Sequence, residues 1–93
     1  MSKTIWKYTR NIEDMINLEI PEGGKFLCAA VNGPGEVSVW VELDEDREAT
    51  PRTLRIYGTG NSMPNDPGRY ISTVIDPRQM FTFVWHVYEP VSL

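Results

Sequence analysis

The sequence predicts an all-β domain, built as a small antiparallel sandwich or a partly open barrel of about seven strands. Three observations indicate this class. Apolar residues recur at every second position through most of the chain, helical spacing is not sustained, and clusters of Gly, Pro, Asn and Asp divide the chain into short segments. A chain of 93 residues with 41% hydrophobic content suits one modest core, so residues 1–93 are expected to form a single β domain.

Three strands are expected in the first third of the chain, at Thr4–Thr9, Met15–Ile20 and Lys25–Val31. Alternation places Trp6 and Tyr8 on one face of the first strand. Residues 10–16 are the least regular part, where a short helical turn is an alternative to extended chain. The third segment is apolar on both faces, which predicts a central strand that is covered from both sides.

Four further strands are expected at Glu36–Leu43, Arg52–Tyr57, Tyr70–Ile75 and Phe81–Tyr88. In the first of these, alternation directs four apolar side chains inward and Trp40 outward. In the second it directs Arg55 and Tyr57 outward. The charged stretch 44–51 is expected to be a solvated loop, and the stretch 58–69, rich in Gly, Pro and Asn, the longest loop.

The net charge of −4 disfavours binding of a nucleic-acid polymer, because the chain repels a phosphate backbone at long range. The single cysteine, Cys28, lies in an apolar run and is expected in the core, as in a protein of a reducing compartment. The chain shows no signal peptide and no run of membrane-spanning length, so we expect a soluble, cytoplasmic protein without a membrane partner. Because a small chain buries a limited fraction of its surface, a homo-oligomer is also expected.

No catalytic residue, cofactor or metal site is expected. His86 is the only imidazole, and no Ser or Cys nucleophile stands in a recognisable motif, so His86 is more simply a hydrogen-bonded packing residue. The acidic cluster at 44–48 lacks the glycine and the spacing of a calcium loop.

A ligand site is predicted around the end of the strand that contains Arg55. Two nearby glycines allow backbone amides to approach a ligand, Arg55 with the adjacent polar side chains can donate to phosphate, and outward aromatic side chains can stack on bases. As alternatives, the glycines only let the chain leave the sheet, or the aromatic face is a second core layer covered by a loop or a neighbouring subunit. The expected ligand-binding residues are Arg55, Tyr57, Gly58, Thr59, Gly60, Asn61, Trp40, Arg69 and His86.

Four segments also carry a resemblance to a known family: Trp6-Lys7-Tyr8, Ile20 to Gly23, Arg55 to Gly60, and Trp85 to Glu89. The chain resembles, from Lys3 to Glu89, a widespread family of small proteins of unknown function that bacteriophages and prophages encode. The resemblance names no reaction. It implies a role in the host cell cytoplasm, such as counteracting host defence.

Two functions follow as hypotheses. The first is a non-catalytic protein that sequesters a small anionic ligand, namely a cyclic oligonucleotide defence signal, with the segment 64–68 closing over the ligand. The second is a protein-binding module, either an inhibitor of a host factor or a small virion or assembly component. An exposed apolar patch without a basic pocket would favour the second.

Overall fold

The computed structural model describes residues 2–78 and 80–91, and within them it contains strands and no helix. All seven expected strands are confirmed, most of them longer by one to three residues at an end. Their bounds are β1 Lys3–Asn11, β2 Met15–Pro21, β3 Lys25–Val31, β4 Glu36–Asp44, β5 Ala49–Gly58, β6 Arg69–Pro77 and β7 Thr82–Glu89.

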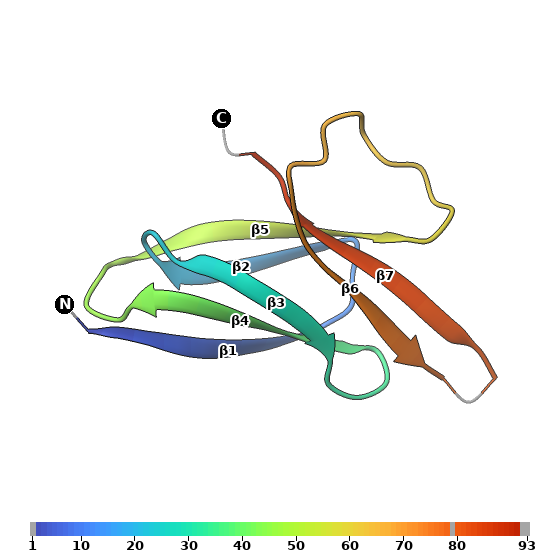
Figure 1. Ribbon diagram of the computed structural model, residues 1–93, viewed down its shortest axis with the longest axis horizontal. Helices are drawn as coiled ribbons and strands as arrows, with labels where there is room; N and C mark the ends of the chain where they lie inside the picture. Colours follow the sequence, from blue (N-terminus) through green and yellow to red (C-terminus); the bar gives the residue numbers. More distant parts are fainter. Residues whose placement is uncertain (1, 79, 92–93) are drawn as a thin grey trace.

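The strands form two sheets that face each other, so the all-β sandwich is confirmed (Figure 1). One sheet has three strands in the order β1-β4-β3, and the other has four in the order β2-β5-β7-β6. Every pairing is antiparallel. The loop from β5 to β6 is the longest connection and stands away from the sheets, as expected.

The core lies between the inner faces of the two sheets. Alternation along β4 and β2 explains it, because every second residue is apolar and buried. Phe26 of β3 is the largest side chain that is completely buried. The buried apolar residues are Ile16, Leu18, Ile20, Phe26, Ala29, Val37, Val39, Val41, Leu43, Leu54, Ile56, Ile71, Val74 and Val87.

The two lateral sides of the sandwich differ. On one side β3 lies beside β6, and side chains of β6 bond to the backbone of β3: Arg69 donates to the Phe26 carbonyl (3.0 Å) and Ser72 to the Ala29 carbonyl (3.2 Å). On the other side β1 pairs only with β4, and β2 only with β5. The described strands therefore do not close into a barrel.

The prediction that Lys25–Val31 is a central strand covered on both faces is wrong. β3 is the edge strand of its sheet, and a bulge at Leu27 brings Phe26 and Ala29 to the inner face. Cys28, which was expected in the core, is exposed on the outer face. No third layer covers that face in the described chain, so apolar composition did not reveal which positions are buried.

Two smaller expectations also fail. Residues 10–16 form no helical turn, because β1 extends through Asn11 and the Ile12 amide donates to the Gly35 carbonyl (2.8 Å). The charged loop is shorter than 44–51, since Asp44 ends β4 and residues 49–51 already belong to β5. No helix that could span a membrane occurs in the described part of the chain.

Asp76 is a buried carboxylate that ties the β6–β7 hairpin to the turn before β4. It accepts hydrogen bonds from the Arg78 Nε (2.8 Å) and the Gly35 amide (3.3 Å), and its side chain is fully inaccessible to solvent. The hydrogen bond from Arg78 lowers the pKa of Asp76 despite burial. The pKa of Asp44 is also lowered, chiefly by the backbone amide of Asp46.

These shifts predict acid sensitivity. A carboxyl whose pKa is lower in the folded state stabilises the fold above the ordinary Asp value of about 3.9 and loses that contribution as pH falls toward the folded pKa. The free energy of unfolding should therefore drop as the pH falls below about 4, and in Asp76→Asn it should start lower and drop less. Urea unfolding from neutral pH to pH 2.5 measures this. Asp66→Asn, in the exposed loop, is the control, and an Asp76→Asn variant as steep as the parent would contradict the assignment.

Candidate functional site

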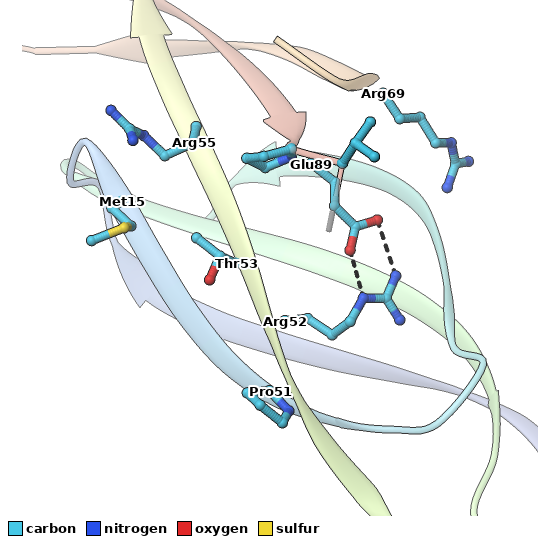
Figure 2. Close-up of a pocket in the computed structure, with 9 residues that line it drawn as sticks. Met15, Pro51, Arg52, Thr53, Arg55, Arg69 and Glu89 are labelled. Atoms are coloured by element: carbon cyan, nitrogen blue, oxygen red, sulfur yellow. Dashed lines mark hydrogen bonds and ion pairs between the residues drawn. The ribbon is translucent and has the colours of Figure 1, made fainter. Parts of the chain in front are cut away.

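A pocket lined by arginines lies where β7 ends beside β5. β5 pairs with β2 from Ala49 to Arg55 but with β7 only from Arg55 to Gly58, because Pro90 follows β7 and cannot donate to a ladder. The edge of β5 before Arg55 is therefore left open there. The pocket has a volume of about 520 Å³ and is lined by Met15, Pro51, Arg52, Thr53, Arg55, Arg69, Glu89, Pro90 and Val91 (Figure 2). We call it the arginine pocket.

Arg52 is held in place by the fold. Its Nε and one terminal nitrogen donate to both carboxylate oxygens of Glu89 (2.5 and 3.0 Å), and the other terminal nitrogen donates to the Gly24 carbonyl (2.9 Å). The guanidinium also lies over the Phe26 ring, 5.0 Å from its centroid. This bidentate pair, drawn as dashed lines in Figure 2, uses most of the donors of Arg52.

Arg55 and Arg69 border the same pocket from different sides. Arg69 donates one terminal nitrogen to the Phe26 carbonyl and is otherwise exposed. The Nε of Arg55 is buried and forms no hydrogen bond within the described residues. The pocket thus contains three guanidinium groups and one carboxylate among its described residues, which gives it a local positive charge.

The outer face of the four-stranded sheet carries an aromatic cluster next to Arg55. The rings of Tyr57 and Tyr70 both meet the ring of Tyr88 edge to face, with centroids 5.9 and 5.5 Å away. His86 lies beside this cluster and is bonded on both ring nitrogens: Nε2 to the Thr59 hydroxyl (2.8 Å) and Nδ1 to the Thr73 hydroxyl (3.0 Å). These two hydrogen bonds fix the orientation of the ring, and both come from hydroxyl groups instead of a carboxylate. This arrangement is typical of a hydrogen-bonded packing residue.

The glycine turn forms a second pocket at the other end of β5. Gly58, Thr59 and Asn61 line it together with residues 82–85 of β7, and its volume is about 400 Å³. A Cβ at Gly58 would lie 2.9 Å from Asn61 Nδ2 and 3.2 Å from the Trp85 ring, so a larger residue there would require these side chains to shift. Gly60 has a positive φ of 89°. The structure therefore separates the glycine turn from Arg69, although the predicted site joined them.

Trp40 lies apart from the other predicted residues. It projects from the outer face of the three-stranded sheet, across from Lys7 and Cys28, whereas Arg55, Tyr57 and His86 belong to the four-stranded sheet. The alternation of β4 and of β5 was predicted correctly. The expectation that Trp40 shares a face with Arg55 is wrong, because alternation gives a residue's face within its sheet and leaves the sheet itself undetermined.

Sequence reasoning did not single out Arg52, Glu89, Tyr70 or Trp85 as site residues. One signal was present for Arg52: it stands at an inward position of the strand, two residues before buried Leu54, where a charge needs a partner. Glu89 meets it only through the pairing of β7 beside β5. Among the described residues there is no group of three or more His, Cys, Asp and Glu side chains that could hold a metal ion.

The fold and the pocket define a small two-sheet β protein with an arginine-lined site at the end of a strand. The chain belongs to the family described as a domain of unknown function (DUF7352), which matches residues 1–92. No curated protein and no solved structure matches the chain.

Proposed function

We propose that this chain is a non-catalytic binding protein whose arginine pocket holds a small anionic ligand. The observation that carries the proposal is the gathering of Arg52, Arg55 and Arg69 around one pocket in a chain whose net charge is −4. A volume of about 520 Å³ lies within the range of small-molecule sites. Because Arg52 is engaged by Glu89, Arg55 and Arg69 are the groups that meet the ligand.

The ligand class that we propose is a cyclic oligonucleotide. Guanidinium groups suit phosphates because they donate in a planar fork, and the aromatic cluster beside Arg55 offers ring surface for bases. Tyr88 is the direct cross-strand partner of Arg55, and Tyr57 stands two residues further along the same strand as Arg55. The proposed role, sequestration of a defence signal in the host cytoplasm, rests on the resemblance to phage-encoded proteins.

The test is retention of a nucleotide by the purified protein. The protein is mixed with a panel of cyclic di- and trinucleotides, the bound fraction is separated by filtration, and the complex is denatured by heat so that the released compound can be chromatographed. Recovery of an intact nucleotide supports sequestration. Recovery of a cleaved product would mean catalysis, and retention of none would overturn the proposal.

Arg55→Ala should weaken retention of the recovered nucleotide by about 10- to 100-fold, because one charge-assisted hydrogen-bonding group contributes about 1.5–3 kcal/mol. The Arg55 side chain forms no ion pair within the described residues, so the stability of the fold should change little. Arg47→Ala removes an exposed arginine of the β4–β5 loop and is the matched control. Equal affinities of the two variants, measured by titration calorimetry, would exclude Arg55 from the site.

A protein-binding module is the second candidate, because large apolar side chains are exposed around the β6–β7 hairpin. Ile75, Met80 and Phe81 are all more than half exposed. Such side chains are typical of the centre of protein interfaces when they gather in one patch. Capture of a single host protein by the parent chain, lost in Phe81→Ser, would favour this candidate over a small ligand.

A further inference from the structure

On the lateral side of the sandwich opposite β3 and β6, which we call the open side, each sheet ends in a strand with one unpaired edge. The outer edges of β1 and β2 have no hydrogen-bonded neighbour among the described strands, and the two strands belong to different sheets. Tyr8 and Arg10 of β1 line one small gap with Ile16 and Leu18 of β2, so the two edges lie at the same side. Exposed edges of this length are templates for pairing with another chain.

The two edges carry opposite charges. The charged residues of β1 are Lys3, Lys7 and Arg10, without an acid, whereas the only charged residue of β2 is Glu19, which follows Glu13 and Asp14 in the preceding turn. Pairing of β1 with β1 would bring cations together, and pairing of β2 with β2 would bring acids together. The pairing that the charges favour is β1 with β2 of another molecule.

We propose that two copies of this chain form a dimer in which β1 of each copy pairs with β2 of the other. The two edges run in opposite directions, as the arrows in Figure 1 show. A two-fold axis parallel to the strands, midway between the sheets on the open side, exchanges the sheets and keeps the strand directions. β1 then lies antiparallel to β2 of the partner, and both open edges of both copies are paired at once.

The register follows from the connection between the strands. β1 runs into the connection at residues 12–14 and β2 runs back from it, so both strands extend from it toward the same end of the sandwich. Residues equally far from residue 13 therefore lie level, and the two-fold axis preserves that level. Tyr8 is then level with Leu18 of the partner, and Lys7 with its Glu19. Lys7 and Glu19 both stand on outer faces, since their neighbours Tyr8 and Leu18 face inward, so they become cross-strand partners of opposite charge.

The dimer also explains an exposed apolar side chain at this side. Trp6 pairs with Val41 and so faces the interior, yet it is 40% exposed because no strand lies beyond β1. A partner strand there would cover it. The other lateral side needs no partner, since Arg69 and Ser72 already bridge β6 to β3. The inference does not depend on the proposed function, because neither Lys7 nor Glu19 lines the arginine pocket.

The test is a charge exchange monitored by sedimentation velocity without ligand. The parent chain should sediment as a dimer. Lys7→Glu and Glu19→Lys should each raise the dimer dissociation constant at least about tenfold, because each places like charges opposite each other at two symmetric positions. The double variant should return to the parent value. Lys25→Glu, the same charge change on β3 of the same sheet, is the control and should leave the dimer unchanged.

Three results would overturn the inference: a parent chain that stays monomeric at high micromolar concentration, single variants that dimerise like the parent, or a double variant no tighter than the singles. Circular dichroism and the urea midpoint of each variant show that it is folded. Nucleotide retention, measured separately on the same variants, tests the ligand proposal without reference to the dimer.

Discussion

Gly68→Ala is expected to destabilise the protein by about 4 kcal/mol, a large part of the stability of a domain this small. Gly68 has a φ of 93° immediately before β6, a conformation that L side chains rarely adopt. A Cβ there would clash with the Glu89 carbonyl oxygen and lie 2.6 Å from Pro90 Cα. Both are backbone atoms at the end of β7, so neither can move aside without disturbing the strand pairing next to the arginine pocket.

Gly60→Ala separates the two causes of that cost. Gly60 has nearly the same φ, 89°, but a Cβ there meets nothing within 4 Å. Its substitution should cost only about 1 kcal/mol, the strain of the backbone conformation alone. Urea unfolding of both variants measures the difference. If the two lose equal stability, the close approach of Gly68 to Glu89 and Pro90 is not what selects glycine at that position.

Arg52→Met should lower the free energy of unfolding by about 2–3 kcal/mol. This loss is smaller than for breaking a fully buried ion pair, because the Arg52 side chain is 22% exposed. Removing the guanidinium leaves the Glu89 carboxylate, which is only 17% exposed, without its bidentate partner. It also leaves the Gly24 carbonyl without its donor and the Phe26 ring without its cation. Methionine keeps most of the aliphatic length, so lost packing contributes little.

Arg55→Met is the matched control, because it makes the same change to a second arginine of the same pocket. Arg55 has no carboxylate partner among the described residues, and its loss should leave the urea midpoint close to that of the parent while nucleotide retention falls. A stability loss in Arg55→Met as large as in Arg52→Met would show that both arginines serve the fold. The division between a structural and a ligand-binding arginine would then be wrong.

Strand positions were predictable from local sequence because they depend on alternation. β4 shows this best: Val37, Val39, Val41 and Leu43 are buried as their spacing requires. β3 shows the limit, since its apolar run suggested two covered faces while Cys28 is exposed. Apolar composition indicates that a segment belongs to a sheet, but the number of layers above it is a property of the whole fold.

The candidate site was predictable only in part. Arg55, Tyr57 and His86 were placed correctly on one outward face, because they share the alternation of β5 and of β7, which pair directly. Arg69 joins Arg55 at the pocket, but the glycine turn lies at the far end of the strand and Trp40 on the other sheet. Glu89, which engages Arg52, comes from a strand whose neighbour the sequence did not reveal.

By itself the sequence determined where the strands lie and, in strands without a bulge such as β4, the face that each side chain takes, because period-two alternation and turn chemistry act over a few residues. Only the tertiary structure decided which strands are neighbours, and hence that three arginines meet at the end of β7 and that β1 and β2 remain unpaired. The reason is physical: strand order is fixed by packing between segments far apart in the chain, and several orders bury the same apolar faces equally well.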